Sequence, residues 1–138
     1  MQLTETQTQI RDTARRFAER EITPHAADWD RAAETPRALY TKMAKAGLIG
    51  ITVAPEHGGA GADFLSCVLA IEEIAAADGG VSNVMAATNS PVAVAIEENG
   101  TDQQKRDYLS RITKGDWLGC ILLTEPHTGS DAAAIRTR

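Results

Sequence analysis

One stretch of the sequence, residues 81–98, restricts the possible folds of this chain more than any other feature. Wound as an α-helix, it carries apolar side chains on nearly every side, which predicts a buried central helix rather than a surface helix. Its three Ser or Thr residues and two Asn residues make it too polar to span a membrane. Pro91 lacks a backbone N–H and clashes with the preceding turn, so we predict a kink or break near Ser90.

Four further segments carry apolar residues at helical spacing and are expected to pack one face against this centre. Thr4 with Gln7, and Thr101 with Gln104, have the pattern of a capping box, in which two side chains satisfy free N–H groups where a helix begins. The apolar residues of the four segments are Ile10, Ala14, Phe17, Ala18 and Ile22; Leu39, Tyr40, Met43 and Ala46; Phe64, Val68, Ile71 and Ala75; and Tyr108, Leu109 and Ile112.

Turn-forming residues separate these helical segments. Pro24 should end the first, because the residue before a proline is pushed out of helical geometry. Residues 28–35 are polar and are predicted to form a loop or a short turn, after which Pro36 would be the first residue of the next helix. Gly47 stands where a glycine commonly follows a helix, and residues 55–61 are predicted to form a loop.

The character of the sequence changes after Lys114-Gly115. Residues 117–123 are a continuous apolar run of strand length, which predicts a β-strand; the shorter run 48–53 is also compatible with an extended backbone. A lone strand needs a partner for its backbone groups, so we expect a β-rich region to come next. The predicted fold class is therefore all-α: a bundle of about five helices (1–113), followed by the first strand of an incomplete β-domain (114–138).

Charge and cysteine content narrow the class of function. The formal net charge of -5, without any block of like charges, argues against nucleic acid or an anionic membrane surface as the main partner. Cys67 and Cys120 form no C-x-x-C pair, so we interpret both as small buried apolar residues in a reducing compartment, the cytoplasm. Met1 leads into a polar helical pattern without the apolar segment of a secretory signal.

Several common catalytic and metal-binding motifs do not fit. The glycine loop 58–61 lacks the third glycine of a dinucleotide fingerprint and the Lys-Ser/Thr pair of a phosphate-binding P-loop, so a turn is the better interpretation. The three histidines are far apart and lack a partner four residues away, so we predict no metal site. Glu72 and Glu73 are adjacent and would point apart on a helix, which favours solvent exposure or an ion pair over acid–base catalysis.

Residues 124–131, T-E-P-H-T-G-S-D, come directly after the predicted strand and could carry chemistry. They contain three hydroxyls, a glycine and several free backbone N–H groups. Such donors can bind an electron-rich heterocycle or a pyrophosphate, and Gly129 allows the backbone to approach closely. The other interpretation is a proline-containing turn whose Ser and Asp cap the next segment of the chain. On these residues alone, both interpretations stay open.

The sequence resembles the acyl-CoA dehydrogenases. The family hallmark, an apolar strand followed by T-E-P-x-x-G-S-D, is present at residues 122–131. Other matching parts occur in the family's order and cover essentially the whole chain: Arg16-Phe17-Ala18, Ile22, Pro24, Gly47-Leu48, Pro55, Gly58-Gly59-Ala60-Gly61, Glu72-Glu73, Asp78, Asn89-Ser90, Gly100 to Lys105, and Tyr108-Leu109.

This resemblance implies a flavoenzyme that introduces a double bond into an acyl-CoA thioester, with FAD as cofactor. A carboxylate removes the α-proton while the β-hydrogen leaves as hydride to the flavin. In the family, the carboxylate and the tetramer contacts belong to a C-terminal helical domain. We therefore expect this chain to be an N-terminal portion without a catalytic residue and inactive alone. The implied partners of the intact enzyme are an electron-transfer flavoprotein and further copies of itself, as a tetramer.

The resemblance also implies which residues bind cofactor and substrate. Thr124 would donate to the pyrimidine end of the flavin, Gly129 and Ser130 would contact its pyrophosphate, and Ser130 would also reach the pantetheine of the substrate. The kinked central helix would line the acyl cavity through Val84, Ala87 and Pro91, which are otherwise ordinary core. The implied cofactor-binding residues are Ile121, Leu123, Thr124, Thr128, Gly129 and Ser130.

Two alternatives to the dehydrogenase stay open. One is a non-catalytic helical module for binding or assembly. The other is a different flavoenzyme on the same fold, either an acyl-CoA oxidase or a flavin monooxygenase.

Overall fold

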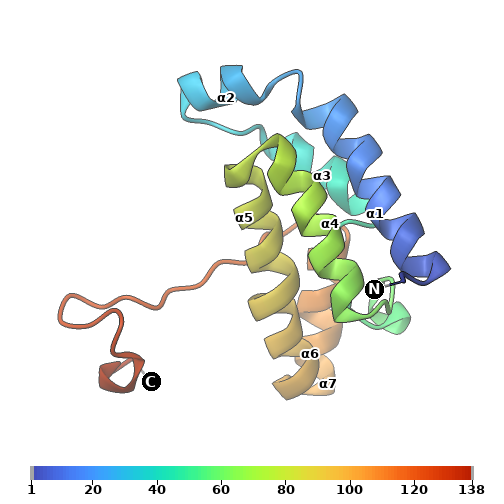
Figure 1. Ribbon diagram of the computed structural model, residues 1–138. Helices are drawn as coiled ribbons and strands as arrows, with labels where there is room; N and C mark the ends of the chain where they lie inside the picture. Colours follow the sequence, from blue (N-terminus) through green and yellow to red (C-terminus); the bar gives the residue numbers. More distant parts are fainter. Residues whose placement is uncertain (1, 138) are drawn as a thin grey trace.

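The computed structural model describes residues 2–137, which form a helical bundle and a tail that leaves it (Figure 1). This confirms the predicted all-α class. The elements in chain order are α1 (Glu5–Phe17), η1 (Ala18–Ile22), α2 (Ala26–Ala32), α3 (Arg37–Lys45), η2 (Pro55–His57), α4 (Phe64–Ala77), α5 (Gly79–Ala87), η3 (Thr88–Val94), α6 (Ala95–Asn99), α7 (Asp102–Gln104), η4 (Lys105–Leu109), α8 (Ser110–Thr113) and η5 (Ala132–Ala134).

Helix α4 lies between α1 and α5 and contributes fully buried side chains such as Ala70 and Ile74 to the core. Both predicted capping boxes form; at α1, Gln7 N donates to Thr4 Oγ1 over 3.2 Å and Thr4 N donates to Gln7 Oε1 over 3.0 Å. Gln7 Nε2 also donates to the carboxylate of Asp63, the N-cap of α4, over 2.8 Å. The beginnings of α1 and α4 are thereby joined.

The predicted central helix exists and continues through its proline. Helix α5 passes directly into η3 and then α6, and Pro91 lies inside η3, whose hydrogen bonds have the wider π-helical pattern. The wider turn accommodates the missing N–H, so the chain is distorted here rather than broken. Val81, Met85 and Ala93 are fully buried, but this helix is not covered on every side among the residues described.

Residues 48–53 are buried but do not form a strand. Asn89 supplies the hydrogen bonds that a strand partner would have given: its Oδ1 accepts from Gly50 N at 2.7 Å and Ile51 N at 3.1 Å. Its Nδ2 donates to Leu48 O at 2.9 Å and to Met85 O at 3.1 Å. The segment can therefore be buried because a side chain satisfies its polar backbone.

Two local predictions are wrong. Residues 28–35 were predicted to be a loop or a short turn, yet α2 covers the first part of this segment and ends at Ala33, which has a left-handed φ of 51°. The helix is seven residues long and has no buried residue, so its sequence carries no apolar stripe that would have predicted it. Pro36 is the N-cap of α3 rather than its first residue. Asp78 is the C-cap of α4 and also the N-cap of α5, where its carboxylate accepts from Val81 N at 2.8 Å.

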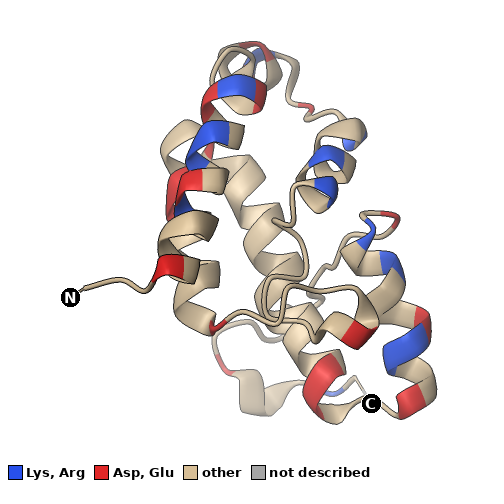
Figure 2. Ribbon diagram, turned by 90° about the vertical axis from the view of Figure 1, so that its right-hand side faces the viewer, with Lys and Arg blue, Asp and Glu red and all other residues tan. Residues whose placement is uncertain are grey.

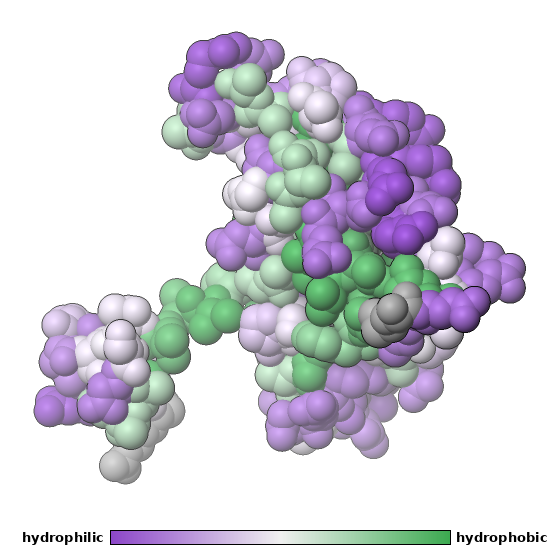
Figure 3. Space-filling view, viewed as in Figure 1, coloured by the Kyte–Doolittle hydropathy of each residue, from purple (hydrophilic) through white to green (hydrophobic). Residues whose placement is uncertain are grey.

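The tail begins after the turn at Gly115. Residues 117–123 form no paired strand within the described chain, where a single bridge between Glu125 and Thr128 is the one β-type pairing. The predicted strand lacks the ladder that would satisfy its backbone. In Figure 3 the apolar part of the tail separates the bundle from the polar end of the chain. None of the helices described has the length and hydropathy needed to cross a bilayer.

Candidate functional site

The loop 124–131 is folded back on itself around Glu125. Glu125 and Thr128 exchange two backbone hydrogen bonds of 2.9 and 3.1 Å. The Glu125 carboxylate accepts from the hydroxyl and N–H of Thr137, at 2.5 and 2.8 Å, and from Arg136 N at 3.0 Å. These hydrogen bonds, that of the Thr137 hydroxyl first, hold the pKa of Glu125 below its ordinary value. The loop has a defined shape, and its carboxylate is engaged in maintaining it.

The same loop leaves other polar groups available. The Thr128 hydroxyl donates to Asp131 O at 2.6 Å, whereas the hydroxyls of Thr124 and Ser130 and the N–H groups of Gly129 and Ser130 have no partner in the described chain. A Cβ placed on Gly129 would lie 3.6 Å from Thr124 Cγ2, so these two residues are neighbours. The loop therefore presents a group of free donors suited to an electron-rich or anionic ligand.

An exposed apolar segment leads into this loop. Ile121, Leu122 and Leu123 are 54%, 95% and 49% exposed. In an extended chain alternate side chains point the same way, so Ile121 and Leu123 share a side. Contiguous apolar exposure of this kind marks an interaction surface.

The predicted substrate residues share one side of the central helix. Val84 and Ala87 are partly buried and Pro91 is exposed. Within the described chain these residues share no pocket with residues 121–131, and Figure 1 shows the tail leading away from the bundle. The assignments to cofactor and substrate accordingly stay predictions.

Two contacts that sequence reasoning missed attach the tail to the bundle. Arg37 donates to Gly115 O at 2.9 Å and to Asp116 O at 2.8 Å. Gly119 N donates to the hydroxyl of buried Thr88 at 3.1 Å. The signal that could have revealed this anchor is Thr88 itself, a polar side chain inside an apolar helix.

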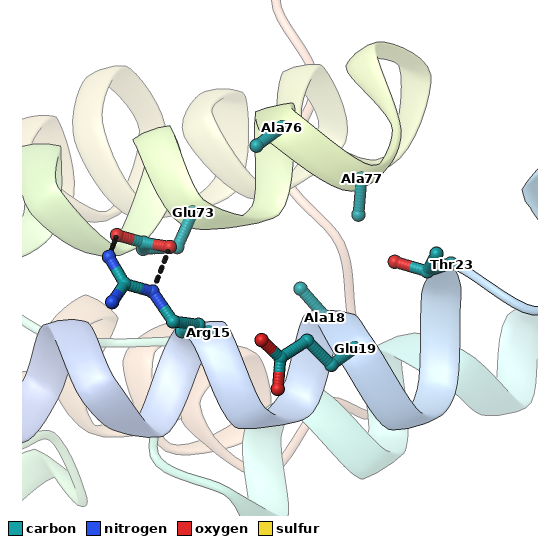
Figure 4. A pocket seen from close by; sticks show the side chains of 7 residues that line it. All are labelled: Arg15, Ala18, Glu19, Thr23, Glu73, Ala76 and Ala77. Atoms are coloured by element: carbon teal, nitrogen blue, oxygen red, sulfur yellow. Dashed lines mark hydrogen bonds and ion pairs between the residues drawn. The ribbon is translucent and has the colours of Figure 1, made fainter.

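A pocket between α1, η1 and α4 contains an Arg and two Glu side chains and could be mistaken for a catalytic site (Figure 4). Arg15 binds Glu73 through two hydrogen bonds of 2.6 and 2.9 Å, and the guanidinium holds the pKa of Glu73 below its ordinary value. Glu72 is exposed. This confirms the prediction of solvent exposure and an ion pair for the two carboxylates. Acidic and basic residues also alternate along α1 in Figure 2, as expected of a solvated face.

The two cysteines differ in environment. Cys67 is fully buried, as predicted, and burial raises the pKa of its thiol to about 11. Cys120 was predicted to be buried as well, but it is exposed. It lies one residue beyond the anchor at Gly119, where the chain leaves the core, so its apolar neighbours do not cover it.

Comparison with known proteins identifies the class to which this bundle and tail belong. Residues 4–116 match the family model described as "Acyl-CoA dehydrogenase, N-terminal domain". The chain belongs to the acyl-CoA dehydrogenase family.

Individual relatives agree with this assignment. An acyl-CoA dehydrogenase of Bacillus subtilis is 41% identical over 137 residues, covering 99% of this chain and 36% of that protein. A short-chain specific acyl-CoA dehydrogenase of Clostridium acetobutylicum is 39% identical, and the match covers 98% of this chain and 36% of that protein. The solved butyryl-CoA dehydrogenase of Megasphaera elsdenii superposes with a TM-score of 0.91 at 33% identity, and the match covers 99% of this chain and 37% of that protein. The chain thus spans about a third of the length of these relatives.

Proposed function

We propose that this chain is the N-terminal part of an FAD-dependent acyl-CoA dehydrogenase that introduces an α,β double bond into an acyl-CoA thioester. Family membership over residues 4–116 supports the reaction class. The single structural observation that carries the proposal is the loop 124–131, which comes after an exposed apolar segment and presents free donors. We propose that the helical domain ends at Thr113 and that a β-domain follows it; the end of α8 at Thr113 supports this boundary.

The residues of the tail fit FAD. Ile121 and Leu123 offer exposed apolar side chains to the flat ring system. The free donors of Thr124, Gly129 and Ser130 suit the ring's polar edge and the anionic pyrophosphate, and Thr128 keeps their loop folded through Asp131. When bound, FAD supplies the acceptor for the hydride. A solved glutaryl-CoA dehydrogenase of Mycobacterium smegmatis in complex with FADH2, 31% identical to this chain, supports the choice of flavin.

This chain's own part in the reaction is to bind and orient. Val84, Ala87 and Pro91 would line the acyl chain, and Ser130 would also reach the pantetheine. No residue here is assigned as the catalytic base. Glu125 is unsuited to that role, because hydrogen bonds lower its pKa, whereas a general base works best with a pKa near the operating pH.

An electron-transfer flavoprotein is the proposed electron acceptor, and the intact enzyme is proposed to be a tetramer. One similar solved structure, 41% identical with a TM-score of 0.93, comes from work titled for the electron transferring flavoprotein of Acidaminococcus fermentans. This title supports the choice of acceptor. The acyl chain that the enzyme prefers is not assigned.

The test uses the whole protein that contains this chain, mixed without oxygen with acyl-CoA thioesters of increasing length. We expect one length class to bleach the visible flavin absorbance, and an electron-transfer flavoprotein to restore it. Rapid oxygen consumption by the reduced protein would instead indicate an oxidase or a monooxygenase. Absence of flavin, or of bleaching with every thioester, would leave the non-catalytic module as the better description.

A further inference from the structure

Within residues 2–137, the tail makes one hydrogen bond to the central helix, from Gly119 N. Among the residues described, the hydrogen bonds made from residue 120 onward stay within the tail. Gly119 is therefore the last point at which the bundle fixes the chain before the proposed flavin segment begins at Ile121. Two residues of extended chain span at most about 7 Å, so the position of Gly119 limits where Ile121 can lie.

The attachment uses both hydrogen-bonding functions of one hydroxyl. Thr88 is fully buried at the first position of η3. Its Oγ1 donates to Val84 O at 2.8 Å and accepts from Gly119 N at 3.1 Å. Because the hydroxyl proton is donated to Val84 O, the lone pairs of the hydroxyl oxygen can accept the hydrogen bond from Gly119 N. Valine in this place would keep the shape and lose both bonds, whereas serine would keep both.

Steric contact reinforces the hydrogen bond one helical turn further on. A Cβ on Gly119 would lie 2.7 Å from Val92 Cβ and 2.9 Å from both of its methyl groups. The backbone of the tail thus touches the helix at Gly119 with no room for a side chain. Thr88 and Val92, four residues apart, lie on one face of the helix and together set where the tail departs.

We propose that Thr88 is a positioning residue that sets the flavin-binding tail against the acyl-binding face of the central helix. This inference rests on the proposed function. Val84, whose carbonyl receives the Thr88 proton, belongs to that acyl-binding face, and Gly119 lies two residues before the first proposed flavin contact. The Thr88 hydroxyl therefore connects the helix proposed to line the acyl chain with the tail proposed to bind the flavin. Transfer between them requires atoms about 3–3.5 Å apart, and a misplacement of about 1 Å can cost about 100-fold in rate.

The test compares Thr88→Val with Thr88→Ser in the whole enzyme. For Thr88→Val we expect kcat to fall at least about tenfold, with KM for the acyl-CoA changed less than about twofold. We also expect backbone hydrogen exchange in residues 117–121 to quicken at least about tenfold, with or without flavin, because Gly119 N loses its acceptor. Thr88→Ser should restore the exchange protection and kcat to within about twofold.

Thr113→Val is the matched control. Thr113 is also buried and its hydroxyl donates to His57 O at 3.0 Å, but it makes no hydrogen bond to residues 117–121. It should lower thermal stability about as much as Thr88→Val while leaving kcat and the exchange of residues 117–121 unchanged. Equal losses of kcat in both valine variants would overturn the proposal, as would unchanged exchange in Thr88→Val.

A second pair of variants covers the case in which Thr88→Val does not fold. Gly119→Ala keeps the Thr88 hydroxyl but pushes the tail off Val92, so kcat and exchange protection should fall again. Adding Val92→Gly removes the Val92 Cβ, which the new methyl would meet at 2.7 Å, together with both Val92 methyl groups, and should restore the protection. No effect of Gly119→Ala on either measurement refutes the inference. If the enzyme shows no dehydrogenation at all, the proposed function fails, but the exchange measurements still decide whether Thr88 fixes the tail.

Discussion

Asn89 is fully buried and takes the place of a strand partner for the neighbouring backbone. Its amide makes four hydrogen bonds, three of them to the segment 48–51. The adjacent Thr88 likewise accepts a hydrogen bond from the backbone of the tail, at Gly119 N. Two adjacent polar residues in an apolar helix thus hold separate segments of the chain.

We predict that Asn89→Ala lowers the free energy of unfolding by ~3 kcal/mol, because it leaves buried N–H groups of Gly50 and Ile51 without an acceptor. Urea unfolding followed by circular dichroism measures the change. Asn99→Ala is the control, since Asn99 is exposed near the end of the same helix and should change the free energy by less than ~0.5 kcal/mol. Similar losses for the two variants would show that the buried network is not what Asn89 contributes.

At the scale of elements, α1 and α4 are joined at two places by side chains. Gln7 binds the Asp63 cap near their beginnings, and Arg15 binds Glu73 further along. Between these places the small residues Ala14 and Ala70, both fully buried, belong to the core. The apolar contact holds the helices together, and the polar pairs fix their register.

The pairing of Glu73 predicts a dependence of stability on pH. The pKa of Glu73 in the folded chain is lowered from 4.5, chiefly by the hydrogen bond from Arg15. The ionised carboxylate therefore contributes its full stabilisation of the fold above pH 4.5, and this stabilisation is lost as the pH falls through the folded pKa. Glu73→Gln should therefore melt at a lower temperature than the parent near pH 7, and this gap should narrow by pH ~3. The effect is small, because Arg15 is half exposed and solvent screens the pair.

Glu72→Gln is the control for that experiment, since Glu72 is exposed and adjacent in sequence. Its melting temperature should match that of the parent at both pH values. A gap for Glu73→Gln that stays constant between the two pH values would contradict the assignment to the ionised carboxylate.

The whole molecule has two unlike parts, a packed bundle and an exposed tail (Figures 1 and 3). The bundle contains the buried core, whereas the proposed cofactor residues lie on the tail, where Ile121 and Leu123 are about half exposed. A ligand held by the tail alone would keep most of its surface in water.

We therefore predict that the 138-residue chain by itself binds FAD weakly, even though it presents the loop 124–131. Titration of the purified chain with FAD, followed by flavin fluorescence, should show no stoichiometric complex at micromolar concentration. The whole protein is the comparison and should retain FAD on dialysis. A tight yellow complex of the short chain would contradict this prediction.

The sequence by itself determined the helical elements other than α2, and where most of them begin and end. Capping boxes and apolar stripes depend on residues three or four apart, and such neighbours meet whatever the rest of the chain does. This is why Thr4, Thr101 and Gly47 behave as predicted. The loop 124–131 could also be recognised from the sequence, because its residue types occur at a fixed spacing.

The tertiary structure alone decided how the segments are held together. Asn89 meets residues 38 to 41 positions away, Gly119 lies 31 positions from Thr88, and Arg15 lies 58 from Glu73. No local pattern records which distant backbone group a buried amide or hydroxyl will satisfy, because the choice depends on which helices pack side by side. For the same reason the apolar run 117–123 could be interpreted as a strand, while its actual course depends on its contact with Thr88 and Val92.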